Sequence, residues 1–188
     1  MEDISLHILD IAENSVNAGA SAISIRIIEK KDEDLFSVEI EDNGRGIPEE
    51  LKDKVLDPFY TTRTTRRVGL GLSLLKQAAE ATGGKLALRS EPGKGTTVTA
   101  IFRPGHIDME PVGSIADTIT VLIAGSPDID IVFSWDKNGR IFSFDTKELR
   151  AGLEGVPLNS PDVLVEVRKF ISESLAEIEK PAERGGRY

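Results

Sequence analysis

Asp42-Asn43-Gly44-Arg45-Gly46 is the stretch from which the fold and the chemistry of this chain can best be predicted. It follows residues 36–40, where apolar and polar side chains alternate with the period of a half-buried strand. A carboxylate held at a strand end can accept a hydrogen bond from an exocyclic amine, such as that of adenine. The two glycines let the backbone approach a flat ring because they lack Cβ. The stretch therefore predicts a nucleotide-binding loop.

A helix upstream of this loop carries a matching polar face. Apolar residues recur at helical spacing over residues 4–16, and Gly19 ends the pattern. Asp10 and Asn14 are one turn apart on the polar face of this helix. The amide oxygen of Asn14 can join phosphate oxygens and waters around Mg²⁺. Asp10 is placed to take a proton from a nucleophile, which makes it the predicted catalytic residue.

A second loop has the composition that suits a polyphosphate. Gly69 and Gly71 stand at the start of a helix predicted over residues 72–81, and the first amides of a helix favour anions. Three arginines concentrate positive charge in this loop of an otherwise acidic chain: Arg63, Arg66 and Arg67. The phosphates of the nucleotide are therefore expected at this loop.

Alternating apolar residues predict the strands that surround these loops. Residues 23–27 and 36–40 form an antiparallel hairpin, since their connection is too short for a crossover helix. Residues 85–90 and 96–103 form two more strands, joined by a glycine-rich turn. Together with the helices, these elements predict a domain over residues 1–104.

The C-terminal third carries a weaker pattern and no recognisable catalytic motif. It predicts, in order, strands at residues 119–124, 129–135 and 141–144, a helix that begins near Asp145, and a helix from Pro161 to Ile178. We expect a C-terminal extension at residues 112–180 and a flexible tail at 181–188. The apolar stripe of the last helix predicts packing on the strands before it, although its spacing also suits a homodimer interface.

Composition excludes several classes of function. The chain has 188 residues, a net charge of −9 and no cysteine. The acidic balance disfavours nucleic acid and anionic membrane as partners. The absence of cysteine excludes disulfides and thiolate metal sites. No apolar run has the length needed to cross a bilayer, and the acidic N-terminus is unlike a secretory signal, so we expect a cytoplasmic protein.

Five motifs, taken in order, resemble the GHKL superfamily, which includes gyrase, the ninety-kilodalton heat-shock chaperone, sensor histidine kinases and mismatch-repair ATPases. The motifs are an asparagine box at residues 10–15, a glycine box at 42–47, a phenylalanine box at 57–62, a second glycine box at 69–73 and a final box at 93–96. The sequences of the last three motifs resemble those of histidine kinases. The resemblance covers about residues 3 to 103.

The resemblance implies the Bergerat fold, an α+β two-layer sandwich whose mixed, mostly antiparallel sheet is covered by helices on one face. It implies that ATP lies between the helices and a lid, and that Asn14 coordinates Mg²⁺. Asp42 would bind the adenine amine, supported by Gly46 and, through water, by Thr96. The other implied nucleotide-binding residues are Gly44, Thr61, Thr62, Arg67, Gly69, Leu70, Gly71 and Leu72.

Two positions depart from the family pattern. Arg67 stands two residues before Gly69, where histidine kinases usually have glycine, so the lid is less flexible or Arg67 contacts phosphate. Asp10 stands where hydrolysing members usually have glutamate, and it is one methylene shorter.

The resemblance implies a regulatory kinase that acts on a partner protein, similar to anti-sigma-factor serine kinases. We expect no segment with a phosphoacceptor histidine before the asparagine box, and His7 lies inside the nucleotide-binding helix. One alternative is a slow ATPase whose nucleotide state gates assembly, for which Lys137 and Lys147 are the candidate catalytic lysines. The other is a non-catalytic, ATP-gated interaction module that docks on its partner through the region after residue 112.

Overall fold

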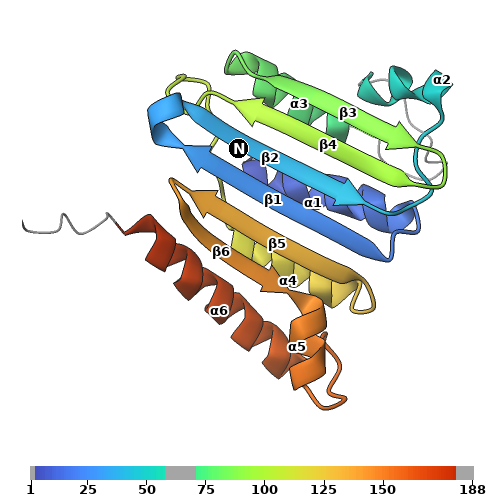
Figure 1. Cartoon of the computed structure of the whole chain (residues 1–188), viewed down its shortest axis with the longest axis vertical. Coiled ribbons are helices and arrows are strands. Elements are labelled where there is room, and N and C mark those ends of the chain that lie inside the picture. The colour runs from blue at the N-terminus through green and yellow to red at the C-terminus, as the bar shows by residue number, and fades with distance from the viewer. Residues whose placement is uncertain (1–2, 58–70, 181–188) are drawn as a thin grey trace, which may run out of the picture.

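A six-stranded sheet with helices on one face forms the framework of the protein, as a computed structural model shows for residues 3–57 and 71–180 (Figure 1). The strand order is β3-β4-β2-β1-β5-β6. The strands are β1 (Ala22–Lys30), β2 (Leu35–Asp42), β3 (Lys85–Glu91), β4 (Gly95–Phe102), β5 (Asp130–Lys137) and β6 (Arg140–Asp145). The α-helices are α1 (Ile4–Asn17), α2 (Glu49–Lys52), α3 (Gly71–Ala81), α4 (Ile115–Gly125), α5 (Thr146–Gly152) and α6 (Pro161–Glu179). Two single 3₁₀ turns lie at Lys31–Glu33 and Lys54–Leu56.

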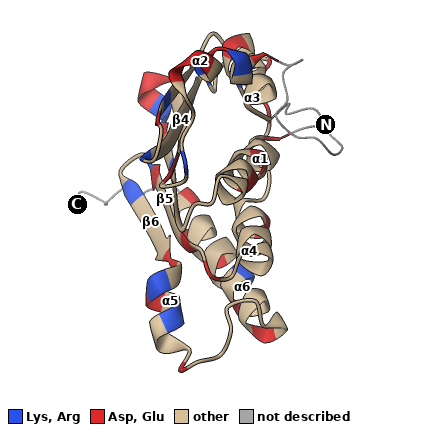
Figure 2. Ribbon diagram, turned by 90° about the vertical axis from the view of Figure 1, so that its right-hand side faces the viewer, with Lys and Arg blue, Asp and Glu red and all other residues tan. Residues whose placement is uncertain are grey.

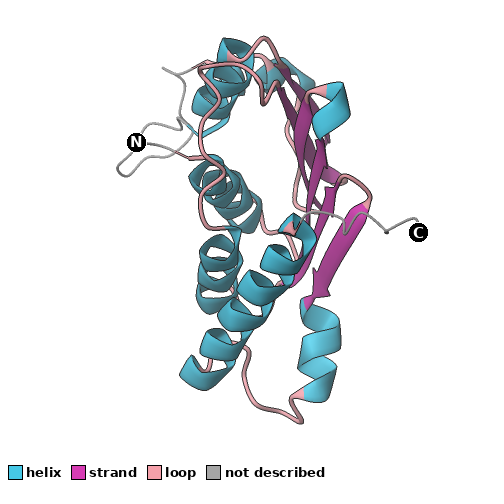
Figure 3. Cartoon of the chain, turned by 90° about the vertical axis from the view of Figure 1, so that its left-hand side faces the viewer, coloured by secondary structure: helices cyan, strands magenta, loops and turns pink. Residues whose placement is uncertain are grey.

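The sheet is mixed and mostly antiparallel, which confirms the predicted fold class. All neighbouring strands pair antiparallel except β1 and β5, which run parallel. Parallel strands need a long crossover connection, and here it spans residues 31–129, which include β2, β3, β4 and α4. An edge-on view shows α1, α3, α4 and α6 on the same side of the sheet (Figure 3). The result is a two-layer sandwich.

Apolar side chains fill the space between the two layers. Ile4, Ile8 and Ile11 recur at helical spacing on α1, and all three are buried. The ring of Phe36 on β2 lies edge-on to the rings of Phe102 and Trp135, with centroids 6.1 and 6.3 Å away. These contacts join β2 to β4 and β5, so the core is continuous across the sheet.

The C-terminal strands extend the same sheet beyond β1. Asn138 and Gly139 join β5 to β6 with positive φ angles of 53° and 88°, as a two-residue hairpin turn requires. The Asp145 side chain accepts a hydrogen bond from the Lys147 amide and caps α5. The predicted stripe of α6 is buried against α4 and β6 at Val167, Ile171 and Leu175. The boundary between residues 104 and 112 stays a prediction.

The strand predicted at residues 119–124 is wrong, because this segment is the second half of helix α4. Ser114 caps the helix by accepting a hydrogen bond from the Asp117 amide. The buried residues recur at helical spacing only when the whole helix is considered: Ile115, Ala116, Ile119, Leu122 and Ile123. A six-residue window of β-branched residues suggested a strand, but burial against α1 and α6 outweighs that propensity.

Candidate nucleotide site

Asp42 ends β2 with its carboxylate buried and held by two donors. The Ser15 hydroxyl on α1 donates to Oδ2 at 2.7 Å, and the Gly44 amide donates to Oδ1 at 2.9 Å. Both donors are neutral, and no Lys or Arg within residues 3–57 or 71–180 forms an ion pair with Asp42. Each carboxylate oxygen can accept a second hydrogen bond. The arrangement therefore fixes the carboxylate while leaving acceptor capacity for a ligand amine.

Two glycines allow the loop after Asp42 to pack against the β3–β4 turn. A Cβ on Gly46 would lie 2.1 Å from the Glu91 carbonyl oxygen, and a Cβ on Gly95 would lie 1.8 Å from the Asp42 carbonyl oxygen. Both glycines have positive φ angles, 69° and 105°. The Gly93 amide donates to the Arg45 carbonyl at 2.8 Å across the same contact. Gly46, one of the two glycines predicted to face a ligand ring, is thus also required where two backbones meet, as is Gly95.

Thr96 lies directly across from Asp42 in the register of β4 and β2. Cross-strand partners project from the same face of the sheet, about 5 Å apart, so Thr96 stands where a water could join it to Asp42. The Thr96 hydroxyl also shares a hydrogen bond of 2.8 Å with the Ser90 hydroxyl. Ser90 accepts from the Ile47 amide at 2.8 Å and thereby holds the end of the glycine loop.

The polar face of α1 lies beside the start of α3. A Cβ on Gly71, the first residue of α3, would lie 3.1 Å from the Asp10 Cβ, so only a very small residue lets the two helices approach this closely. Asp10 therefore lies at the N-terminal end of α3, where the helix dipole is favourable for negative charge. Asn14 follows one turn later, and both side chains are exposed.

Part of the predicted site lies outside the residues that the structure describes. These positions are Thr61, Thr62, Arg67, Gly69 and Leu70. Of the predicted site residues that the structure describes, Gly44 lies in close contact with Ala18, the C-cap of α1. A Cβ on Gly44 would lie 3.0 Å from the Ala18 Cβ. Leu72 is half-buried and packs against the hydrophobic core. The structure thus brings together Asp42, Gly44, Gly46 and Thr96, and places Asp10 beside Gly71.

The donor set fits Mg²⁺ held mainly by a nucleotide. Within residues 3–57 and 71–180 there is no cluster of three or more His, Asp and Glu side chains that could hold a metal without help. Mg²⁺ commonly keeps several waters and takes one or two protein oxygens plus phosphate oxygens. The exposed Asn14 amide can supply such an oxygen.

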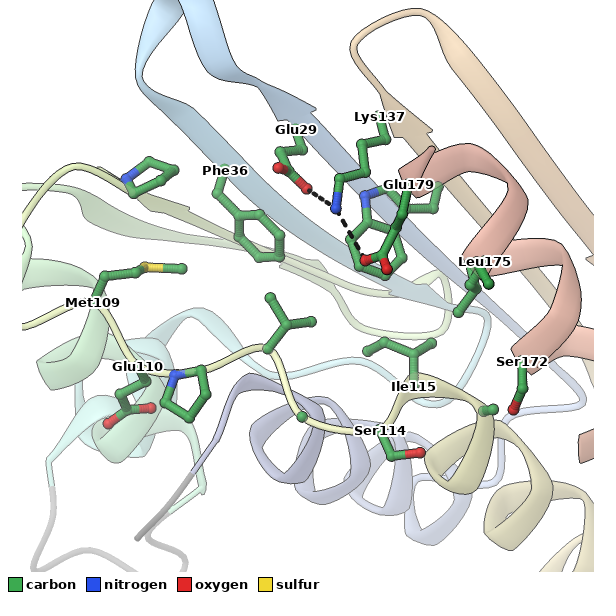
Figure 4. Close-up of a pocket in the computed structure, with 17 residues that line it drawn as sticks. Glu29, Phe36, Met109, Glu110, Ser114, Ile115, Lys137, Ser172, Leu175 and Glu179 are labelled. Atoms are coloured by element: carbon green, nitrogen blue, oxygen red, sulfur yellow. Dashed lines mark hydrogen bonds and ion pairs between the residues drawn. The ribbon is translucent and has the colours of Figure 1, made fainter. Parts of the chain in front are cut away.

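Neither candidate lysine for an ATPase lies at this site. Lys137 forms ion pairs with Glu29 at 3.3 Å and Glu179 at 3.1 Å, in a cavity of about 460 Å³ (Figure 4). Lys137 faces Glu29 in the β1–β5 register, whereas Asp42 faces Ile23, so the two levels are ~20 Å apart along β1. Lys147 on α5 forms an ion pair with Asp130 at 3.3 Å. Asp130 is the first residue of β5, which lies on the opposite side of β1 from β2 and Asp42.

Two serines that hold the site were not assigned a role from the sequence. Ser15 is buried on the apolar face of α1, and Ser90 is buried on a strand whose other inward positions are Leu86 and Leu88. A polar residue at a core-facing position is the signal that could have identified both of them.

Comparisons with known proteins match the first part of the chain. Residues 2–106 match the family described as histidine kinase-, DNA gyrase B-, and HSP90-like ATPase. Sensor kinase CckA of Brucella abortus (strain 2308) is 38% identical over 90 residues, 47% of this chain and 9% of that protein. The histidine-protein kinase AtoS of Escherichia coli (strain K12) is 39% identical over 96 residues, 50% of this chain and 16% of that protein.

Another histidine kinase and a solved structure are also similar to this chain. Histidine protein kinase SaeS of Staphylococcus aureus (strain MRSA252) is 33% identical over 104 residues, 53% of this chain and 29% of that protein. The chain therefore spans less than a third of the length of each of these three relatives. A solved N-terminal domain of a DNA repair protein has 17% sequence identity and a TM-score of 0.52, over 76% of this chain and 52% of that one. This likeness supports the Bergerat fold.

Proposed function

Since this chain belongs to the family of histidine kinase-, DNA gyrase B- and HSP90-like ATPases, we propose that it is a regulatory kinase that uses ATP and Mg²⁺ to phosphorylate a partner protein. The observation that carries the proposal is the buried Asp42 carboxylate, oriented by neutral donors from Ser15 and Gly44. The similarity of the same segment to one sensor kinase and two histidine protein kinases favours phosphoryl transfer over other uses of ATP.

Asp42 and Thr96 bind the base in this proposal. The free acceptor positions of Asp42 receive the adenine amine, and the Thr96 hydroxyl joins the same amine through water. Asn14 provides a protein oxygen for Mg²⁺, which neutralises phosphate charge when it is bound. Because Ser15 and Gly44 orient the Asp42 carboxylate, little ordering of this side chain is needed when ATP binds.

Asp10 is the proposed general base. The oxygen of an acceptor hydroxyl forms a bond to the terminal phosphorus of ATP while its proton passes to the Asp10 carboxylate. The bond between that phosphorus and the bridging oxygen breaks, and ADP leaves with the electron pair. The N-terminal end of α3, beside Asp10, favours the anionic form that the base needs.

The placement of the two histidines favours a phosphoacceptor on another protein. His7 is 3% exposed, and its Nε2 lies 3.0 Å from a Glu110 carboxylate oxygen, so it is closed off from a phosphoryl group. His106 follows β4, and its Nδ1 lies 3.4 Å from an Asp108 carboxylate oxygen. Repulsion between this carboxylate and an approaching phosphate disfavours phosphorylation of His106.

The test follows the terminal phosphate of labelled ATP. The protein is purified from its own cells with the proteins that accompany it and is incubated with ATP labelled at the terminal phosphate. We expect label on a partner, and we expect Asp10→Asn to remove that label while changing ATP affinity less than about threefold. Release of free phosphate without labelled protein would establish the ATPase alternative. Tight ATP binding with neither outcome would establish the interaction module.

A further inference from the structure

A groove lies at the end of the molecule, between α5, α6 and the last residues of β6 (Figures 1 and 3). It has a volume of about 580 Å³. Its walls are mostly apolar and include Phe144 of β6, Leu149 of α5, and Val163, Val167 and Phe170 of α6. The groove is separate from the nucleotide site, because β6 is the outermost strand on the opposite side of β1 from Asp42.

Phe170 is the exposed anchor of this groove. Its side chain is 52% exposed, although its ring contacts the rings of Phe142 and Phe144, at centroid distances of 5.8 and 6.5 Å. These neighbours fix the ring without covering it. A rigid, half-exposed aromatic surface in a concave apolar site offers contact area at a low entropy cost.

Four carboxylates surround the apolar walls, and among the residues that the structure describes no lysine or arginine lines the groove. The carboxylates belong to Asp145, Glu148, Asp162 and Glu166. Within residues 3–57 and 71–180, none of the four forms an ion pair. The first three lie at the N-terminal ends of α5 and α6, where they also offset the helix dipoles. Glu166 lies one turn further along α6, so the dipole does not account for it.

Three of the four cations of the same two helices pair elsewhere, and the fourth, Lys169, is exposed and is not among the residues that line the groove. Lys147 and Arg150 of α5 bind Asp130 on β5, and Arg168 of α6 binds Asp117 on α4. These three cations therefore neutralise carboxylates outside the groove. The edge-on view with charges marked shows basic residues on α5 and acidic residues along the neighbouring elements (Figure 2). Among the described residues, the four carboxylates around the apolar groove therefore have no cation paired with them.

We propose that this groove docks a basic amphipathic segment of a partner protein, with apolar anchors against Phe170 and flanking Lys or Arg side chains at the four carboxylates. Charge complementarity selects this occupant. A second copy of the chain is disfavoured, because a two-fold contact would place identical acidic rims against each other. Docking requires no nucleotide, so the proposal stands or fails separately from phosphoryl transfer.

The test uses a pair of synthetic peptides and the full chain. One labelled peptide of about 14 residues combines Leu and Phe at helical spacing with Lys, and its matched control has Glu in place of every Lys. Fluorescence anisotropy without ATP measures both affinities. We expect the Lys peptide to bind at least about tenfold more tightly, with binding weakened by salt. The double variant Glu148→Lys/Glu166→Lys should reverse this preference.

Two controls separate the groove from general attraction to an acidic protein. Asp32→Lys/Glu33→Lys makes the same change in net charge in the exposed turn between β1 and β2, and it should leave the Lys peptide affinity within about twofold. Phe170→Ser should weaken it roughly tenfold. Equal effects of the two double variants, equal binding of the two peptides, or sedimentation showing dimers that are lost in Phe170→Ser would each overturn the proposal.

Discussion

Two aspartates on the same sheet show how differently a carboxylate can be held. Asp42 ends β2, is buried, and receives hydrogen bonds from a hydroxyl and an amide. Asp136 lies on β5 toward the other end of the strands, and its Oδ2 receives a hydrogen bond of 2.7 Å from the Lys30 ammonium. The ammonium, together with the Gly139 amide, holds the pKa of Asp136 below its usual range.

The difference separates a structural carboxylate from a binding carboxylate. Lys30 neutralises Asp136, so that pair is complete within the fold. Neutral donors orient Asp42 but leave its charge and its second lone pairs in place. A buried charge that the fold orients without neutralising is costly, and a ligand donor would offset that cost.

The largest expected effect is the loss of ATP affinity when Asp42, the binding carboxylate of this comparison, is replaced. In Asp42→Asn the side chain carries an NH₂ group, which must face either one of the internal donors or the adenine amine, so a donor meets a donor. We expect ATP affinity to fall about a thousandfold, roughly 4 kcal/mol, in isothermal titration calorimetry. Asp136→Asn is the matched control and should keep ATP affinity within about twofold. Unchanged affinity in Asp42→Asn would remove the base-binding role.

The next effect compares two glycines that both have positive φ angles. Gly95 and Gly139 have φ angles of 105° and 88°, but only a Cβ on Gly95 would collide with the chain, 1.8 Å from the Asp42 carbonyl oxygen. We expect Gly95→Ala to lower the free energy of unfolding by about 3 kcal/mol and Gly139→Ala by about 1 kcal/mol, measured by urea denaturation. Equal losses would mean that conformational strain alone accounts for Gly95.

Local patterns account for most of what could be predicted. The glycine loops, the hairpins and the face of α1 each depend on residues close together in sequence, and their ends were predicted with errors of at most three residues. Residues 119–124 were wrong because a short β-branched run has no clear period. The parallel pairing of β1 with β5 joins Ala22 to Asp130, a contact that no local pattern contains.

The same dependence on contacts between residues far apart in sequence explains why Ser15 was not predicted as part of the site. Asp42 could be identified because glycines follow it directly, whereas Ser15 acts on Asp42 from 27 positions away. Its hydroxyl looked like an ordinary part of a helix. Only the packing of α1 against the end of β2 shows that Ser15 orients the carboxylate.

Ser15→Ala measures how much the orientation of the Asp42 carboxylate contributes to ATP affinity. Removal of the hydroxyl leaves one carboxylate oxygen without its internal donor and frees the side chain to turn. We expect ATP affinity to fall about tenfold, roughly 1.4 kcal/mol, with fold stability reduced by about 1 kcal/mol. Ser15→Thr keeps the hydroxyl and should restore part of the affinity in the same titration. A full loss of affinity in both variants would indicate a packing defect instead.

The smallest effect concerns the complete pair, and it depends on pH. Because Lys30 lowers the pKa of Asp136 in the folded protein, the pair stabilises the fold above the unfolded value near 3.8. This stabilisation is lost as pH falls through the lower folded value. Asp136→Asn should therefore reduce the free energy of unfolding by about 0.5 to 1 kcal/mol at pH 7, since both side chains are partly exposed.

The difference between the wild type and Asp136→Asn should shrink toward zero in chemical denaturation at progressively lower pH below about 4. It should also shrink at pH 7 in 1 M salt, because salt screens a partly exposed pair. Asn can still accept the hydrogen bond from the Gly139 amide, so a difference that persisted unchanged in acid would mean that the effect of Asp136→Asn does not come from the charge pair with Lys30. In that case neutralisation by a cation would not be what distinguishes Asp136 from Asp42.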